Sequence, residues 1–282
     1  MKRTGFVYHE DFARFGYPVL RERIQPAFED LKAEGLLEKV FLIKPKPIQE
    51  DLLRRVHSVG MVEAVKETVY YRAALLSASG VVFLAEKVWV GELDNGFALT
   101  GTAGHHAGKD RFWGFCYFND VALAIENLRW RFKALKEKFT VLDTDSHHGD
   151  GTRDIFQNDL NVQHICFCSR SETSDDGTKI DVAVPYSVKD EGYVKLVREN
   201  FVSNVERFKP KMVFWHFGYD THKNDYGSRG LTEECYIRLT KLVKDVAEKV
   251  CDGKLVVVLC GGSKPDIAKN IIPKMVKILL EE

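Results

Sequence analysis

Short apolar runs alternate with longer amphipathic stretches along the whole chain. The runs are rich in β-branched residues, and the strongest of them are apolar throughout rather than alternately apolar and polar. Such runs are typical of strands in a parallel sheet that is covered on both faces. The expected strands are 5–8, 39–44, 96–100, 139–145, 162–169, 181–186, 212–218 and 254–262.

Between these runs, apolar residues recur at helical spacing. The clearest segment opens with Thr232 as its expected N-cap and carries two acidic residues in the first turn. The expected helices are about 19–35, 59–69, 72–88, 116–137, 189–207, 232–249 and 265–281. This alternation predicts a single three-layer α/β/α domain over residues 1–282, with a mainly parallel sheet of roughly eight strands.

Composition narrows the class of protein. Hydrophobic residues make up 45% of the 282 residues, and 41 basic residues balance 41 acidic ones, so bulk charge gives no reason to expect nucleic-acid or membrane binding. The six cysteines form no C-x-x-C pair and are expected to be reduced, buried thiols. No signal peptide or membrane-spanning stretch is evident, so a cytoplasmic location is expected. The sequence leaves the oligomeric state open.

Three expected strand ends carry dense polar clusters, where a doubly wound sheet places its ligand. In 142–151, Asp143, Asp145 and His147 alternate and would project from one face of an extended backbone. The other clusters lie in 215–225 and 101–110. Each cluster alone is compatible with an ordinary turn.

Together the clusters supply the parts of a hydrolytic metal site. Asp145, His147 and Asp220 offer oxygen and nitrogen ligands that suit a zinc ion and leave a position open for water. His105 and His106 could remove a proton from that water and protonate a leaving amine. The remaining carboxylates, Asp143 and Asp150, could hold the two imidazoles.

The sequence resembles the histone deacetylase superfamily, which includes acetoin-utilisation proteins and acetylpolyamine amidohydrolases. The matching segments are GHHA (104–107), GFCYFNDVALAI (114–125), VLDTDSHHGDGTRDIF (141–156), FGYDTHKNDYG (217–227) and LT (231–232). They follow the family order over nearly the whole chain. The resemblance implies the arginase/deacetylase fold and a zinc-dependent amidohydrolase acting on acyl-lysine or another acylated amine.

The resemblance also implies roles for single residues. Asp145, His147 and Asp220 would be the zinc ligands. His106, oriented by Asp150, would be the general base and acid, and His105, held by Asp143, the electrostatic histidine. Gly114 and Phe115 would line the tunnel that takes the substrate. Asp143 and Ser169 match positions that bind a structural monovalent cation, K⁺, in some relatives.

Three departures from the family pattern affect substrate binding. The family's oxyanion-binding tyrosine is replaced by Ser263, its arginine by Gly101, and its substrate-gripping acid by Val59. Because loss of one oxyanion donor costs about 10²–10³ in rate, we expect low activity on acetyl-lysine. An alternative is a zinc-containing protein that binds acyl groups or small carboxylates with little turnover. A further alternative is an arginase-like hydrolase. Such an enzyme would need two metal ions bridged by carboxylates, whereas the pair His105–His106 favours a single metal ion.

Overall fold

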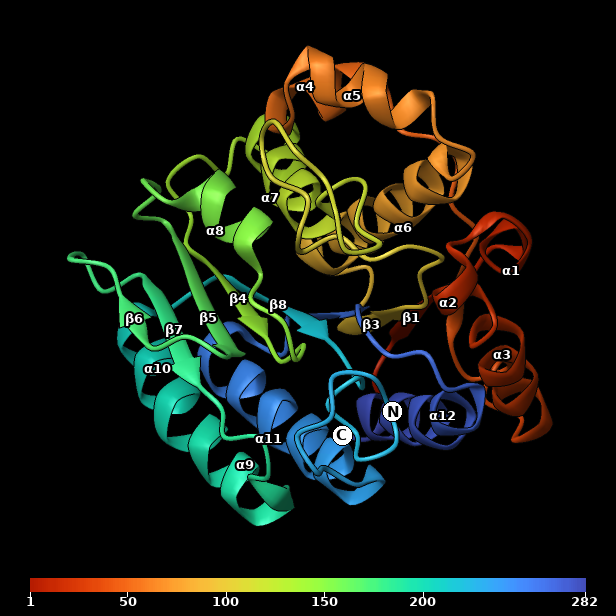
Figure 1. Cartoon of the computed structure of the whole chain (residues 1–282), viewed down its shortest axis with the longest axis vertical. Coiled ribbons are helices and arrows are strands. Elements are labelled where there is room, and N and C mark those ends of the chain that lie inside the picture. The colour runs from red at the N-terminus through yellow and green to blue at the C-terminus, as the bar shows by residue number, and fades with distance from the viewer.

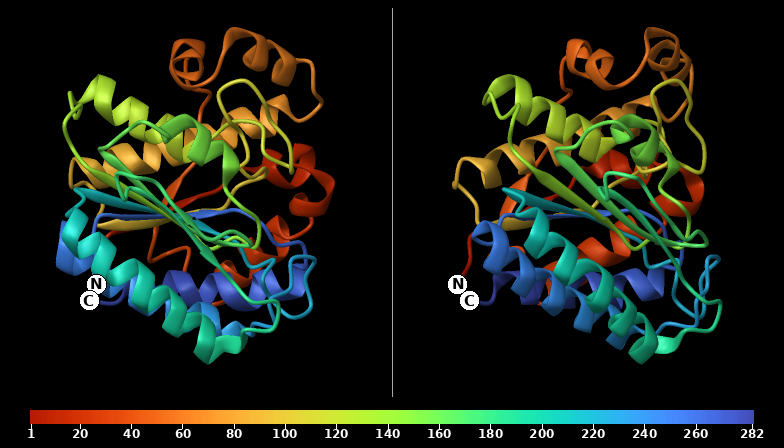
Figure 2. Two further views of the ribbon diagram at one scale, coloured as in Figure 1. Left: turned by 60° about the vertical axis from the view of Figure 1, so that its left-hand side comes forward. Right: turned by 90° about the vertical axis from the view of Figure 1, so that its left-hand side faces the viewer.

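The apolar runs form one twisted sheet with helices on both faces (Figures 1 and 2). The computed structural model describes all residues, 1–282. The strands are β1 (Thr4–Val7), β2 (Phe41–Ile43), β3 (Asn95–Ala98), β4 (Phe139–Asp143), β5 (Val162–Cys168), β6 (Glu172–Thr173), β7 (Lys179–Ala183), β8 (Met212–Phe217) and β9 (Leu255–Leu259). The α/β class is therefore as expected from the sequence.

The sheet has nine strands in the order β2-β1-β3-β9-β8-β4-β5-β7-β6. Every neighbouring pair is parallel except β6 and β7, which are antiparallel. The sequence missed β6 because its two residues are exposed and carry no apolar signal. β7 ends at Ala183, short of the expected 186, because its last residues leave the buried part of the sheet.

The helices fall into two layers, as Figure 2 shows. They are α1 (Glu10–Phe15), α2 (Pro18–Arg21), α3 (Ile24–Ala33), α4 (Glu50–Val56), α5 (Val59–Lys66), α6 (Tyr71–Trp89), α7 (Asp120–Arg131), α8 (Asp150–Phe156), α9 (Lys189–Val197), α10 (Ser203–Phe208), α11 (Glu233–Cys251) and α12 (Pro265–Leu280), with a π-turn η1 (Arg198–Val202) before α10. Helices α6 and α7 cover one face, with α4 packed on α7, and α3, α9, α11 and α12 lie on the other side. None of the helices is long and apolar enough to span a bilayer.

Local capping explains where several expected helix limits were wrong. The expected helix 116–137 begins only at Asp120, because the side chain of Asn119 accepts the Ala122 N–H and fixes the N-cap there. Thr232 is the N-cap of α11, but its hydroxyl donates to Asp190 rather than capping the helix. The short helices α1, α4 and α8 were not expected, because each spans two turns or fewer.

Arg23 joins the first helical layer to the loop that follows β9. It is fully buried between α2 and α3, where the expected helix 19–35 is interrupted. Its Nη1 donates to the carbonyl of Gly262 at 2.5 Å and its Nη2 to that of Cys260 at 2.6 Å. This guanidinium therefore fixes the backbone that lies beside the polar strand ends.

We expect Arg23→Leu to lower the free energy of unfolding by about 2–4 kcal/mol, because two buried carbonyls lose a charged donor. Urea titration followed by circular dichroism measures the change. The exposed neighbour Arg21 is the matched control, and Arg21→Leu should stay within about 0.5 kcal/mol of the native protein. Equal midpoints for the two variants would contradict this role of Arg23.

Candidate metal centre

The polar clusters meet at the carboxyl ends of four adjacent strands. β3, β9, β8 and β4 lie side by side and parallel, so the loops that follow them emerge at one edge of the sheet. The β4 loop carries Asp145 and His147, the β8 loop carries Asp220, and the β3 loop carries His105 and His106. Sheet order thus brings together residues more than one hundred positions apart.

The three expected ligands converge on one point. His147 Nδ1 lies 3.0 Å from Asp145 Oδ1 and 3.0 Å from Asp220 Oδ2. Both carboxylates are buried, and Asp220 Oδ2 has no hydrogen-bond donor. The expectation that strand geometry aligns these residues was wrong in detail, because β4 ends at Asp143. Instead Asp145 Oδ1 accepts the N–H of His147 in the loop, and this turn brings the two side chains together.

A glycine backbone packs directly against the carboxylates. The N–H of Gly261, just after β9, donates to Asp145 Oδ2 at 2.7 Å. A Cβ at this position would collide with that oxygen and would lie 2.9 Å from Asp220 Cγ. Only glycine therefore lets the β9 loop approach closely enough to donate to the buried oxygen.

The charges of these three side chains favour a bound cation. Burial and the charge of Asp145 raise the pKa of Asp220 to about 7. The carboxylates of Asp145 and Asp220, each 3.0 Å from His147 Nδ1, raise the pKa of His147 to about 10. The two buried carboxylates thus favour a positive charge, whether a proton or a metal ion, at the point where the three ligand atoms meet. Two oxygens and one nitrogen fit a zinc ion with an open coordination position.

Each expected catalytic histidine is held by the carboxylate that the resemblance implied. His105 Nδ1 lies 2.9 Å from Asp143 Oδ2, and His106 Nδ1 lies 2.6 Å from Asp150 Oδ1. The two rings lie next to each other, with centroids 4.0 Å apart. Since each Nδ1 is engaged by a carboxylate, each Nε2 is left for other partners.

The two histidines differ in charge. Burial opposes a charge on His105, but the carboxylates of Asp143 and Asp145 outweigh it and raise the pKa of His105 well above its usual value. Burial and the neighbouring charge on His105 lower the pKa of His106 to about 4, although Asp150 opposes this shift. These shifts favour the charged form of His105 and the neutral, basic form of His106 at neutral pH.

A cavity of 210 Å³ is lined by Asp145 and His147 of the trio and by the two histidines. Gly114 and Phe115 line it, as expected, together with Trp113. Gly114 has φ +58°, and a Cβ there would lie 2.5 Å from the His106 ring. Phe115 also has positive φ, 68°, which is rare for a bulky side chain, and its ring stacks on Tyr17 at 4.3 Å between centroids. This strained segment holds an aromatic wall against the histidine.

Ser263 does not face the cavity. Its hydroxyl donates to Asp225 Oδ1 at 2.9 Å, and its N–H donates to Asp225 Oδ2 at 2.9 Å. Tyr226, the next residue after Asp225, lines the cavity instead. Its hydroxyl accepts the N–H of Gly262 at 3.1 Å and would lie 3.0 Å from a Cβ at Gly261. A tyrosine hydroxyl therefore stands beside the trio although position 263 is a serine.

Sequence reasoning missed Tyr226 and two further residues of the site. Trp113 donates from Nε1 to Asp150 Oδ2 at 3.1 Å, and its ring lies 3.9 Å from that of His106 between centroids. His216, in β8, lies with Nε2 3.1 Å from Asp120 Oδ1 and Nδ1 3.9 Å from Asp143 Oδ2. Trp113 directly precedes the resembling segment 114–125, and Tyr226 lies within the segment 217–227, which was the available signal.

The structure does not bring Ser169 to Asp143, the pair expected at a monovalent cation. Ser169 is exposed on the loop after β5, whereas Asp143 is fully buried. The β5 residue in register with Asp143 is Cys166, and with His164 it forms the surroundings of this carboxylate. The expected K⁺ ion therefore stays a prediction, and the exposure of Ser169 gives it no support.

The chain is similar to known proteins over most of its length. A family model for the histone deacetylase domain matches residues 66–279. The chain belongs to the histone deacetylase family. A probable deacetylase of Archaeoglobus fulgidus is 32% identical over 92% of this chain and 81% of its own length. A histone deacetylase-like amidohydrolase of Pseudomonas aeruginosa is 29% identical over 82% of this chain and 68% of its own.

Other members of the family are longer. Histone deacetylase 5 of Arabidopsis thaliana is 28% identical over the whole chain, which spans 49% of that protein. Among solved structures, the HD domain of HDA15 superposes with a TM-score of 0.89 at 25% identity, over 99% of this chain and 88% of that one. The arginase/deacetylase fold is thereby confirmed, and the chain is a hydrolase of the deacetylase family.

We expect Asp220→Ala to reduce the stabilisation by added zinc, because the variant loses the part that depends on this trio. An ion that binds the folded state raises the melting temperature by mass action, so metal-free native protein should gain stability as Zn²⁺ is added. Differential scanning fluorimetry across a zinc titration measures this shift. Asp245→Ala, at an exposed position of α11, is the control and should respond as the native protein does. The same zinc-induced shift in Asp220→Ala would contradict the ligand assignment.

Proposed function

We propose that the chain is a zinc-dependent deacylase that hydrolyses acyl groups from acylated amines such as acyl-lysine. The observation that carries the proposal is the convergence of Asp145, His147 and Asp220 beside a cavity that His105 and His106 line. We take residues 1–282 as one catalytic domain. The six buried free thiols support a location in a reducing compartment such as the cytoplasm.

A bound zinc ion would polarise the amide carbonyl and lower the pKa of a water molecule. The residues around it divide the proton transfers between them. His106, neutral and held by Asp150, accepts a proton from the attacking water and delivers it to the departing amine nitrogen. His105, charged and held by Asp143, stabilises negative charge as the tetrahedral intermediate forms.

Tyr226 is the proposed oxyanion donor. Burial raises the pKa of its phenol far above the usual value, so the hydroxyl keeps its proton. Because the hydroxyl oxygen already accepts the Gly262 N–H, its own proton is free to be donated toward the cavity. Tyr17, which the sequence offered as a substitute, packs on Tyr70 and Phe115 and does not line the cavity.

This hydroxyl changes what the serine at 263 implies. The hypothesis of a binding protein with little turnover depended on the lack of an oxyanion donor, and Tyr226 supplies one. We therefore expect hydrolysis of unactivated acetyl-lysine rather than of activated acyl groups alone. The main direct consequence of Ser263 is its pair of hydrogen bonds to Asp225, which hold the residue before Tyr226.

The rim of the site indicates the class of amine. The cavity opens into a wide basin of 640 Å³ with Trp113, His147 and Tyr226 in both. The basin is lined by Arg170 and Arg229, and Asp150 is its only acidic residue. Such a rim does not suit a polycation, so a side chain or small molecule with one acylated amine fits better than a polyamine.

We expect His106→Ala to reduce kcat on an acetyl-lysine peptide by about 10²–10⁴ without loss of metal, because the proton acceptor is removed. In the native protein, kcat/KM should fall as the pH drops toward 4, where His106 becomes protonated and can no longer act as a base. Lys109→Ala, at an exposed position of the same loop, is the matched control. Near-native turnover by His106→Ala would place the base elsewhere.

We expect Tyr226→Phe to lower kcat on acetyl-lysine by about 10²–10³, since the variant keeps the ring but loses the hydroxyl. The loss should be smaller on trifluoroacetyl-lysine, whose more electrophilic carbonyl needs less oxyanion stabilisation. Ser263→Ala should leave the ratio of the two rates unchanged. Steady-state assays with the paired substrates measure this, and an equal loss on both substrates would show that Tyr226 does not contact the oxyanion.

A further inference from the structure

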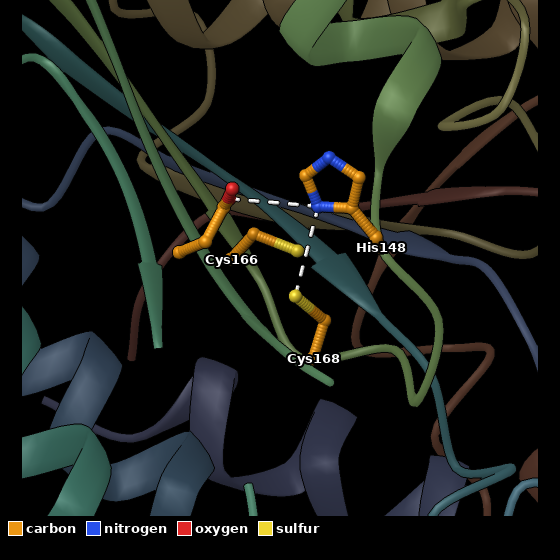
Figure 3. Close-up of side chains that lie close together, drawn as sticks. His148, Cys166 and Cys168 are labelled. Carbon is orange, nitrogen blue, oxygen red and sulfur yellow. Dashed lines mark hydrogen bonds and ion pairs between the residues drawn. The ribbon is translucent and has the colours of Figure 1, made fainter. Parts of the chain in front are cut away.

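Four metal-ligating side chains meet at a second point, outside the trio of Asp145, His147 and Asp220. His148 lies in the loop after β4, Cys166 and Cys168 lie on β5, and Asp181 lies on β7. One donor atom of each lies within 4.8 Å of the other three. Figure 3 shows both sulfur atoms and the imidazole of His148 pointing toward one another. None of these residues has a part in the proposed hydrolysis.

We propose that His148, Cys166, Cys168 and Asp181 form a second, structural zinc site. Four protein ligands around one ion leave no open position, which distinguishes structural from catalytic zinc. Two thiolates with one nitrogen and one oxygen favour zinc over the hard cations Mg²⁺, Ca²⁺ and K⁺. The proposal does not depend on the catalytic role of the first site.

The spacing of the donors matches a tetrahedral ion. His148 Nδ1 lies 3.6 Å from Cys168 Sγ and 3.5 Å from Asp181 Oδ1. A tetrahedral zinc with Zn–S of about 2.3 Å and Zn–N of about 2.0 Å separates sulfur and nitrogen by about 3.5 Å. The same geometry separates nitrogen and carboxylate oxygen by about 3.3 Å. His148, Cys168 and Asp181 therefore need only small movements to bind one ion.

The hydrogen bonding around the cluster leaves a place for a cation. Asp181 is buried, and neither of its carboxylate oxygens has a hydrogen-bond donor. Each sulfur accepts a backbone N–H at 3.4 Å, Cys166 from Gly149 and Cys168 from Arg170. Such bonds favour the thiolate form that binds metal, and they orient the ligands as the outer shell of a metal site does.

The charges of the cluster sum to zero when a divalent ion is included. Two thiolates and the Asp181 carboxylate carry three negative charges, and Arg153 Nη1, 3.3 Å from Asp181 Oδ2, carries one positive charge. A zinc ion makes the group neutral, which a buried site requires. His148 also lines the open basin, so an ion has a path to the cluster from solvent.

A disulfide is a poorer explanation of the two cysteines. They are two residues apart on one strand, so their Cα atoms are separated by about 6.5 Å, near the upper limit for a disulfide.

A zinc ion at this second site would also affect the structure of the site formed by Asp145, His147 and Asp220. It would hold His148 to β5 and β7 and thereby fix the loop that carries the neighbouring ligand His147.

Cobalt(II) reports the two sites separately, because only thiolate ligands give an intense sulfur-to-cobalt charge-transfer band in the near ultraviolet. Reduced, metal-free native protein should bind two Co²⁺ ions per chain and develop this band. Asp220→Ala should lose one ion and keep the band. Cys168→Ser should lose the other ion and the band, whereas Cys235→Ala, at a buried cysteine on α11, should keep both.

Zinc X-ray absorption on Asp220→Ala gives a test that needs no cysteine variant. We expect one zinc per chain with two sulfur neighbours at about 2.3 Å. A native protein with free thiols that gives no cobalt band, a band that survives in Cys168→Ser, or zinc without sulfur neighbours would each overturn the second site. None of these results would affect the proposal of hydrolysis at Asp145, His147 and Asp220.

Discussion

Three carboxylates buried at the ends of adjacent strands are the constraint on which the rest of the site depends. Asp143, Asp145 and Asp220 are each no more than 1% exposed, and an unpaired charge in such surroundings is costly. Asp143 is paired with His105, and Asp145 accepts backbone N–H groups, including that of Gly261. Asp220 keeps an oxygen without a hydrogen-bond donor, and a metal ion bound there would complete the balance.

The carboxylates of Asp143 and Asp150 give the two histidines different roles. Asp143 lies in the buried layer and keeps His105 charged, whereas Asp150 lies nearer the surface and also accepts from Trp113. Burial and the charge on His105 then lower the pKa of His106, its neighbour in sequence. Of two adjacent, chemically identical side chains, His105 thus favours a positive charge, whereas His106 favours the neutral form and can act as a base.

Sequence alone predicted the α/β sheet and the trio Asp145, His147 and Asp220, because long apolar runs and dense polar strand ends are local signals. It missed β6, whose two residues are polar, and it assigned the oxyanion position to Ser263 by alignment with the family. The use of Tyr226 could not be predicted, because it depends on how the β8 and β9 loops pack in space. The cysteines were correctly expected to be buried, but their meeting with His148 and Asp181 depends on the register of β5 and β7.

The central claim is that the buried carboxylates hold the ion that makes this chain a hydrolase. Its most direct test is a titration of metal-free protein with Zn²⁺ while hydrolysis of an acetyl-lysine peptide is followed. The account predicts that activity is absent without metal and rises until the site of Asp145, His147 and Asp220 is filled. Equal turnover by the metal-free and zinc-loaded protein would contradict it.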